Sequence, residues 1–226
     1  MQKPVLFWDF HGTLTIPADD WLDATWIHLP PNKIDRQELS DKFYLMCMPW
    51  WTMPGQHTPS GEDWWDYVQT GFIKLLIDCG YEKSEAEYAV SRLRETVTDP
   101  ARHHLYPDAI PTLAELQRRG YKNILVSNNF PELWKVAQGL GLAPYFSGHV
   151  ISGAVGWDKP SPEIFRLALA EAGNPKEGIM IGDNPVDDVQ GEKGVGLKAI
   201  LVHPRRLSQQ ADATLENLSQ LLDILR

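Results

Sequence analysis

The chain has 226 residues, of which 43% are hydrophobic and 23% are charged, a balance typical of a globular protein that can bury a sizeable core. Its formal net charge is −9 and it has no run of lysine or arginine, which argues against nucleic acid or an anionic membrane as the main partner. The two cysteines, Cys47 and Cys79, form no metal-binding pair, and no stretch approaches the ~20 apolar residues of a membrane span, so we expect a cytoplasmic protein with reduced thiols.

The first predicted element is an apolar run, Val5–Trp8, which ends in Asp9 and is followed by Gly12. A short apolar run closed by turn residues is typical of a buried parallel strand. Ligands of open α/β sheets lie outside the carboxyl ends of such strands, so Asp9 is a candidate catalytic carboxylate. A strand that simply ends in an Asp-containing turn has the same pattern, and this stretch alone does not decide between the two.

Residues 17–100 show helical patterns broken by proline and glycine. About 85 residues are too many for a connection, so we expect a separate helical subdomain. Its first expected parts are a helix that carries Trp21 and Trp26 and is capped by Asp19 or Asp20, a helix over about 35–48, and a proline-rich loop over 48–55. Two further helices are expected after the loop. One carries Trp64, Val68, Phe72, Leu75 and Cys79 and ends before Gly80, and the other is capped by Ser84 and carries Ala86, Val90, Leu93 and Val97.

Six of the nine tryptophans lie in this helical stretch. Large aromatic side chains fill the core of a small helical unit, and this is the expected role for most of them. The proline-flanked pair Trp50 and Trp51 is also a candidate for lining a substrate pocket, although core packing is the simpler interpretation of each residue.

From Leu105 onward, predicted strands and helices alternate, which indicates a doubly wound α/β fold with a parallel sheet. The expected strands are 123–126, 149–152, 178–183 and 198–202, and the expected helices open near 106–108, at Pro131, at Ser161, at Val186 and at Leu215.

Polar side chains follow these elements at points that would meet at one sheet edge. They are Ser127 and Asn128 after one strand, Lys159 before the helix at Ser161, and Asp183, Asp187 and Asp188 after another strand. Each alone has a structural explanation as a turn, solvated or helix-capping residue. Together with Asp9 they supply what phosphoryl transfer needs, namely a nucleophile, cations and hydrogen-bond donors for the phosphate oxygens.

The segment Asp9-Phe10-His11-Gly12-Thr13 resembles the first motif of the haloacid dehalogenase (HAD) superfamily, which reads Asp-x-Asp-Gly-Thr. Ser127, Lys159 and Gly182–Asp188 resemble the second, third and fourth motifs, in order and over nearly the whole chain. The resemblance implies a HAD-like, Rossmann-type core over 1–16 and 101–226. It also implies an all-α cap over 17–100, which lies between the first two motifs, as it does in the family.

The resemblance also implies roles for individual residues. Asp9 would attack phosphorus and form an aspartyl-phosphate in a Mg²⁺-dependent hydrolysis of small organic phosphates. The implied Mg²⁺ ligands are Asp9, the backbone carbonyl of His11, Asp183 and Asp188, with Asp187 as the alternative to Asp188. The implied phosphate ligands are Ser127, Asn128, Lys159 and the backbone amides around Phe10 and His11.

His11 departs from the family pattern, because phosphatases of the family carry an aspartate there that protonates the leaving oxygen and then activates water. Histidine is a common acid–base side chain, and we expect magnesium and Lys159 to lower its pKa, so that it serves better as a base than as an acid. The other histidines, including His103 and His104 near the second connection to the helical stretch, are expected to be structural or solvated.

The missing aspartate leaves two alternatives open. One is a phosphonatase or other non-phosphatase HAD chemistry, and the other is a non-catalytic phosphate-binding or regulatory protein. A phosphonatase would need a Schiff-base lysine in the helical stretch, for which the candidates are Lys33, Lys42, Lys74 and Lys83. The sequence carries no signal for an oligomeric state.

Overall fold

The structure is a computed structural model that describes residues 3–17, 20–31, 33–51, 57–203 and 208–226, with the side chains at 20, 44–51 and 192–193 outside the described set. Its centre is a six-stranded sheet in which all neighbouring strands are parallel. The strands are β1 (Val5–Trp8), β2 (Asn123–Ser127), β3 (Gly148–Ile151), β4 (Gly178–Gly182), β5 (Lys198–Val202) and β6 (Ala213–Leu215). The predicted α/β class is confirmed.

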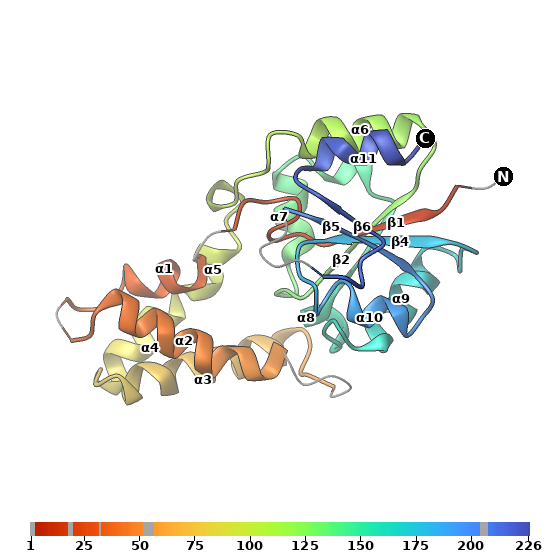
Figure 1. Cartoon of the computed structure of the whole chain (residues 1–226). Coiled ribbons are helices and arrows are strands. Elements are labelled where there is room, and N and C mark those ends of the chain that lie inside the picture. The colour runs from red at the N-terminus through yellow and green to blue at the C-terminus, as the bar shows by residue number, and fades with distance from the viewer. Residues whose placement is uncertain (1–2, 18–19, 32, 52–56, 204–207) are drawn as a thin grey trace.

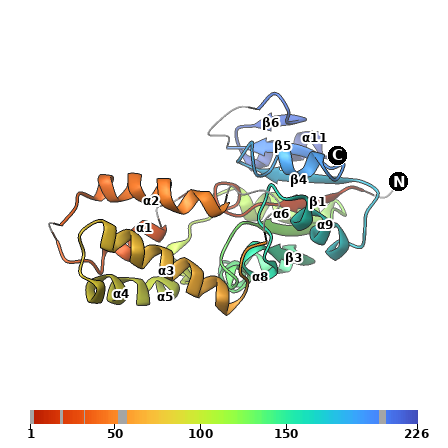
Figure 2. The same cartoon turned by 90° about the horizontal axis from the view of Figure 1, so that it is seen from below.

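The strands lie in the order β3-β2-β1-β4-β5-β6, so β1 is central and pairs with both β2 and β4. In Figure 2 the labelled strands β6, β5, β4, β1 and β3 follow one another from the top of the sheet to the bottom. All four residues of β1 are buried. Because side chains alternate along a strand, Leu6 and Trp8 belong to one core cluster and Val5 and Phe7 to another, on the opposite face. The continuous apolar run of β1 is therefore the pattern of a strand covered on both faces.

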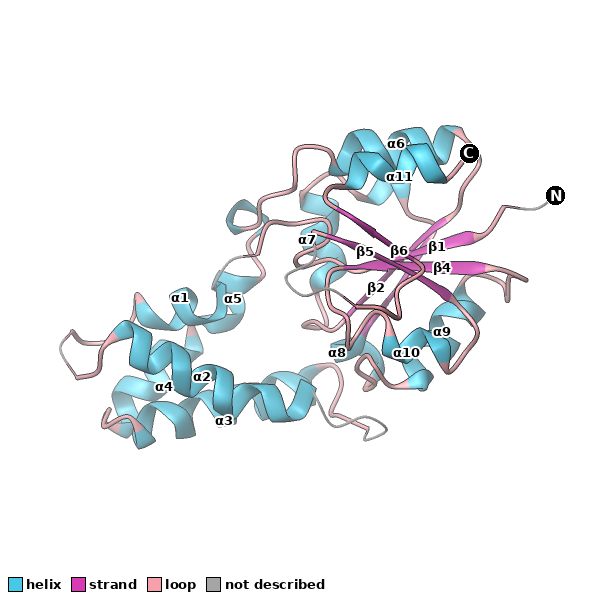
Figure 3. Ribbon diagram, in the orientation of Figure 1, coloured by secondary structure: helices cyan, strands magenta, loops and turns pink. Residues whose placement is uncertain are grey.

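Helices cover both faces of the sheet (Figure 3). Buried residues of α6 (Ala109–Arg118), α7 (Leu133–Gly139) and α11 (Leu221–Ile224) belong to the core cluster of Leu6 and Trp8, whereas those of α9 (Pro162–Glu171) belong to the cluster of Val5 and Phe7. The short helices α8 (Ser152–Val155) and α10 (Gln190–Lys193) follow β3 and precede β5.

Helices α1–α5 lie between β1 and α6 in the chain, and the strands run toward them (Figure 1). They are α1 (Asp20–Trp26), α2 (Arg36–Trp51), α3 (Glu62–Asp78), α4 (Lys83–Ser91) and α5 (Leu93–Val97). We found no strand among the described residues of 17–99, which agrees with the helical pattern of the sequence. These helices therefore lie next to the carboxyl edge of the sheet, where the predicted site residues are located.

The two chain segments that join these helices to the rest of the fold run side by side. Thr15 and Leu105 form an antiparallel bridge, the Ile16 amide donates to the His104 carbonyl at 2.8 Å, and the Tyr106 amide donates to the Leu14 carbonyl at 3.0 Å. We call residues 14–16 and 104–106 the paired connection. Its hydrogen bonds hold the entry and the exit of the helical part together.

Several predicted boundaries in the helical part are wrong. Helix α2 continues to Trp51, so residues 48–51 of the predicted 48–55 loop are helical in spite of Pro49; residues 52–56 lie outside the described set. The helix assigned to a Ser84 cap begins instead at Lys83, and the backbone amide of Glu82 donates to the Glu85 side chain at 2.8 Å. It is also divided, since α4 ends at Ser91 and α5 begins at Leu93.

The predicted C-terminal helix from Leu215 is also wrong at its start. Leu215 belongs to β6, where it pairs with Val202 of β5, and the helical turns begin only at Leu218. Sheet pairing therefore overrides the helical spacing of the apolar residues in this segment. Among the described residues, no helix combines the length and the apolar character needed to cross a membrane.

Candidate active site

The turn after β1 places the first motif at the sheet edge. The Asp9 amide donates to the Ile181 carbonyl at 2.9 Å, which extends the pairing with β4 by one residue. The Phe10 carbonyl then accepts the amides of Thr13, Leu14 and Thr15 at 3.3, 2.9 and 3.0 Å, so the chain turns back on itself immediately after Asp9. This turn presents the side chains of residues 9 and 11 beyond the end of the strand.

Gly12 is required in this turn for two reasons. Its φ of +79° lies in the left-handed region that favours glycine, and a Cβ atom there would lie 2.3 Å from Oδ2 of Asp183. The same close approach recurs at Gly182, the last residue of β4, where a Cβ would lie 2.1 Å from Cγ of Asp188. The two glycines therefore leave room for acidic side chains against the backbone.

Lys159 is the buried cation of the site. Its side chain is 2% exposed, and its Nζ lies 2.8 Å from Oδ1 of Asp9 and 2.6 Å from Oδ1 of Asp188. Burial by itself disfavours the charged amine, but Asp188 and Asp9 together raise the pKa of Lys159 above its ordinary value. Burial raises the pKa of Asp188 to about 6, because one lysine only partly offsets several acidic groups in a buried place.

The backbone of Lys159 is held by the second motif. Asn128 accepts the Lys159 amide at its Oδ1 (2.6 Å) and donates from its Nδ2 to the Lys159 carbonyl (2.8 Å), next to the cis peptide Lys159–Pro160. Ser127, the last residue of β2, is buried beside it. The structure thus joins the second and third motifs through Asn128, whose predicted contact with phosphate stays a prediction.

Three acidic side chains converge as the sequence predicts. Asp9, Asp183 and Asp188 each offer a carboxylate oxygen, and these oxygens all lie within 4.8 Å of one another. Asp187, the alternative ligand, lies outside this group: its Oδ2 accepts Nδ2 of Asn184 at 2.8 Å, and burial, followed by the charge of Asp188, raises the pKa of Asp187 to about 8. The geometry therefore favours Asp188 over Asp187, and an all-oxygen donor set suits a hard cation such as Mg²⁺.

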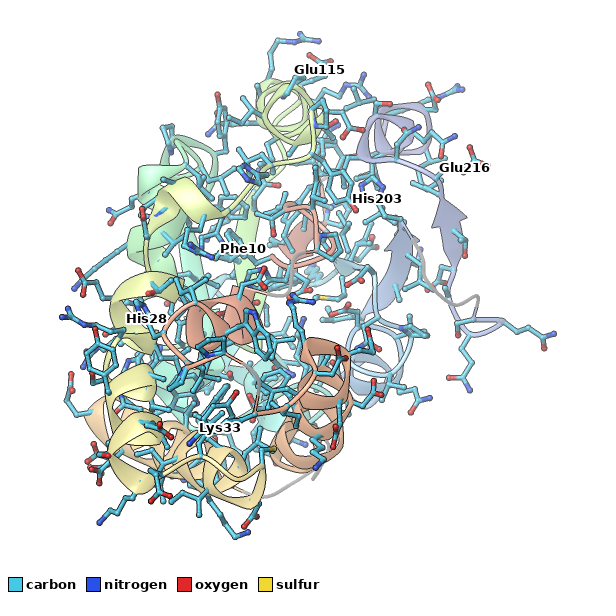
Figure 4. The ribbon with its side chains drawn as sticks, turned by 90° about the vertical axis from the view of Figure 1, so that its left-hand side faces the viewer. Phe10, His28, Lys33, Glu115, His203 and Glu216 are labelled. Carbon is cyan, nitrogen blue, oxygen red and sulfur yellow. The ribbon has the colours of Figure 1, made fainter. Side chains whose placement is uncertain are left out.

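The imidazole of His11 packs against Phe10, with ring centroids 5.0 Å apart, and its Nδ1 lies 3.3 Å from Oγ1 of Thr15. Phe10 lies in the middle of Figure 4, where α1–α5 meet the rest of the molecule, whereas His28 and Lys33 lie out on the helical part. Burial and, secondly, His103 lower the pKa of His11 to about 4, while Asp9 opposes the change. Lys159, which the sequence analysis expects to lower this pKa, is not among the causes.

His103 is a site neighbour that sequence reasoning missed. It is 5% exposed, and its ring centroid lies 5.4 Å from that of His11. The sequence predicts a structural or solvated histidine, with a substrate role as the unsupported alternative, because nothing local in it indicates contact between residues so far apart in the chain. Its position next to the second connection was the one available signal.

Two of the tryptophans in the helical part pack in the core, as the core-packing interpretation expects. Trp64 and Trp65 are buried in the core, and Trp65 also stacks on Phe130 with centroids 6.0 Å apart. Trp50 and Trp51 lie in the last turn of α2, but their side chains are outside the described set, so their pocket role stays a prediction.

The sequence profile of the haloacid dehalogenase-like hydrolases matches residues 4–196. Similar curated proteins include a phosphoserine phosphatase of Thermus thermophilus, 43% identical over 124 residues that make up 52% of this chain and 50% of that protein. Another is a glyceraldehyde 3-phosphate phosphatase of Methanopyrus kandleri, 30% identical over 131 residues that make up 54% of this chain and 56% of that protein. The chain thus spans about half the length of these relatives.

Two solved structures share the fold over nearly the whole chain. A HAD phosphatase from Thermococcus onnurineus superposes with a TM-score of 0.68 at 24% identity, covering 98% of this chain and 97% of that one. A 2-haloacid dehalogenase from Pseudomonas syringae superposes with a TM-score of 0.64 at 23% identity, covering 100% and 98%. With the profile match over 4–196 and the four motifs gathered at one sheet edge, the chain belongs to the haloacid dehalogenase-like hydrolases.

Proposed function

We propose that this protein is a Mg²⁺-dependent phosphatase of small organic phosphate monoesters in which Asp9 is the nucleophile. The observation that carries the proposal is the buried group of Lys159 between Asp9 and Asp188, with Asp183 within metal-sharing distance. The likeness to a phosphoserine phosphatase and a glyceraldehyde 3-phosphate phosphatase supports the same class of reaction.

In the proposed first step, a carboxylate oxygen of Asp9 bonds to phosphorus while the bond from phosphorus to the leaving oxygen breaks, which gives an aspartyl-phosphate. Lys159, whose Nζ lies 2.8 Å from Oδ1 of Asp9, would offer positive charge to the phosphate oxygens, and Ser127 and the amides of the turn after Asp9 would donate hydrogen bonds to them. Hydrolysis by water then frees phosphate and restores the Asp9 carboxylate.

The acidic group fits a metal ion, because a single lysine charge leaves three buried or half-buried carboxylates with an excess of negative charge. Asp9, Asp183, Asp188 and the backbone carbonyl of His11 would hold Mg²⁺. When bound, Mg²⁺ would supply positive charge that offsets the charge of the transferred phosphoryl group.

We propose that His11 does the acid–base work of the missing aspartate. Its Nδ1 contacts Thr15, which leaves Nε2 for exchanging a proton with water or with the leaving oxygen. A neutral imidazole at pH 7 can accept a proton from the attacking water, but it is too weak an acid to protonate a poor leaving group. We therefore expect activated aryl phosphates to be hydrolysed faster than alkyl phosphates.

Residues 17–100 would act as a cap, with 1–16 and 101–226 as the core that carries the chemistry. Helices α1–α5 lie beside the edge that holds Asp9 (Figure 1), so a substrate at that edge would meet them. By excluding water and contacting the organic part of the substrate, this cap would set the choice of substrate.

A phosphonatase is disfavoured by the state of the candidate lysines. Each of the four lies within 3.5 Å of an acidic partner on the helical part: Lys33 with Glu85, Lys42 with Glu38, Lys74 with Asp78 and Lys83 with Glu87. A lysine that forms a Schiff base is activated by desolvation, whereas these four lysine side chains are 31–75% exposed to solvent.

The test is phosphate release from a panel of aryl and alkyl phosphates, with Mg²⁺ and with a chelator. Release that requires Mg²⁺ and is lost in Asp9→Asn supports the proposal. Asp188→Asn is expected to abolish the response to Mg²⁺ and Asp187→Asn to retain it, which distinguishes the two candidate ligands. If wild type releases no phosphate and Mg²⁺ with beryllium fluoride, a mimic of the phosphorylated aspartate, does not raise the Tm, the catalytic proposal fails.

A further inference from the structure

His103 lies just before the paired connection, with its imidazole turned into the site. Its ring centroid is 5.4 Å from that of His11 and 6.0 Å from that of Phe10, which it meets edge-on. The ring is almost fully buried, so these contacts are made away from water. His103 is therefore part of the wall against which the His11 imidazole rests.

The ring of His103 is itself anchored from the helical part. Its Nε2 lies 2.8 Å from the carbonyl oxygen of Val97, the last residue of α5. A carbonyl oxygen only accepts, so Nε2 carries the proton and donates to it. The orientation of His103 is thus tied to the end of α5 by one buried hydrogen bond.

The other side of His11 is held by the first connection. Oγ1 of Thr15 lies 3.3 Å from Nδ1 of His11, and Thr15 forms the bridge to Leu105. The imidazole of His11 is therefore located between a residue of one connecting segment and a residue that precedes the other. Both segments lead to the helices that face the site.

We propose that His103 is a positioning residue for His11: it fixes the imidazole in the orientation needed for proton transfer and makes that orientation depend on where α5 lies. The proposal rests on the acid–base role of His11 given under Proposed function. The physical reason is that a side chain at the end of a turn can rotate about its χ1 and χ2 bonds, and proton transfer tolerates little misplacement of the donor or acceptor atom.

The test compares His103→Gln with His104→Gln. Glutamine at 103 keeps an amide that can donate to Val97 but removes the ring from His11. His104 is the matched control, because it is the adjacent histidine and its side chain is exposed. We expect His103→Gln to lower kcat by about tenfold with little change in KM, since the loss is in orientation and not in substrate binding. His104→Gln is expected to behave as wild type.

A second readout does not require turnover. The imidazole ¹⁵N and ¹³C signals of His11, assigned by their loss in His11→Gln, are expected to shift in His103→Gln and to stay in place in His104→Gln. If wild type proves to have no phosphatase activity, this readout can still overturn the positioning role. Unmoved His11 signals in a folded His103→Gln protein would overturn the proposal, as would kcat equal to that of wild type in an active enzyme.

His103→Phe keeps an aromatic ring and loses the donor to Val97, so it serves if the glutamine variant does not fold. We expect the His11 signals to move less from their wild-type positions in His103→Phe than in a folded variant that lacks the ring, such as His103→Leu. Equal displacement of the His11 signals in the ring-bearing and ringless variants would show that ring contact does not position His11.

Discussion

At the residue scale, the charge balance of the site depends on Lys159. Its amine is buried and contacts Asp9 and Asp188, and the third acid, Asp183, lies against Gly12. Each of these groups is costly to bury alone and tolerable only with the others present. Lys159 thus offsets the charge of two buried carboxylates.

We expect Lys159→Met to lower the free energy of unfolding by about 3 kcal/mol, because it leaves two buried carboxylates without their cation. Urea unfolding in the presence of a chelator measures the change. Lys74→Met is the matched control, since Lys74 forms an exposed ion pair with Asp78 whose loss should change stability little. Equal stability of the two variants would contradict a dependence of the site on its buried cation.

Gly12→Ala should displace Asp183 from the acidic group. The positive φ alone costs roughly 1–2 kcal/mol, and the new Cβ would in addition lie 2.3 Å from Oδ2 of Asp183. We therefore expect the rise in Tm caused by Mg²⁺ to be lost or greatly reduced. Gly120→Ala carries the same backbone cost, at φ +86°, with nothing within 4 Å of its Cβ, and should keep the full response to Mg²⁺. An unchanged response in Gly12→Ala would argue that Asp183 does not bind the metal.

His203 should make the stability of the protein dependent on pH. Its ring stacks on Tyr106, with centroids 3.7 Å apart, and burial lowers the pKa of His203 below that of the unfolded chain, about 6.5. Below pH 6.5 the unfolded chain binds a proton that the folded one does not, so stability falls as the pH drops toward the lowered pKa.

His203→Asn removes this titration, and asparagine tolerates the positive φ of 48° at this position. We expect its unfolding free energy to fall less than that of wild type between pH 7 and pH 5. Urea unfolding at the two pH values measures the difference. The same fall in the two proteins would show that His203 is not a source of the pH dependence.

At the element scale, α3 and α5 are linked to the segment after β2 by one acidic side chain. Glu132 accepts Nε1 of Trp65 at 2.9 Å and Nε of Arg94 at 2.8 Å, and Arg94 also contacts Glu62. Glu132 lies five residues after Ser127, so the link joins the helical part to the strand end that carries the second motif. Motion of these helices relative to the sheet would have to break it.

We expect Glu132→Ala to loosen α3 and α5 while the sheet stays protected. The substitution leaves the Trp65 indole and part of the Arg94 guanidinium without an acceptor, at a cost of about 1–3 kcal/mol. Hydrogen exchange of the α3 and α5 amides should become faster. Glu87→Ala, which breaks the exposed pair with Lys83, is the matched control and should leave exchange in α5 as in wild type. Unchanged exchange in Glu132→Ala would mean that the aromatic contacts hold these helices.

At the scale of the whole molecule, the helical part and the sheet share a core. The cluster that contains Leu6 and Trp8 of the sheet also contains Phe10, Leu93 and Val97. Substitutions at the boundary are therefore expected to change the packing of both the helical part and the sheet. This continuity explains how α5 can be close enough to the site to hold His103.

Much of this arrangement could be predicted from the sequence, because the signals were local. Four of the five predicted strands are apolar runs closed by turn residues, and Asp9, Ser127 and Asp183 were found because each stands at the end of a strand. The contact of His103 with His11 and that of Glu132 with Trp65 arise from tertiary packing, for which neither residue has a local pattern. The Leu215 boundary failed for a related reason, since β6 forms only through its pairing with β5.

The central place of β1 also has a consequence for how the chain reaches its native state. Leu6 pairs with Asn123 on one side and with Ile179 on the other, so both neighbours of this apolar strand are distant in the chain. Contacts of such long range form slowly, whereas the helices between them can form from local contacts. During synthesis on the ribosome, β1 stays without partners until most of the chain has emerged, and it is then a target for chaperones and for aggregation. We therefore expect the site around Asp9 to form only once these long-range contacts are made.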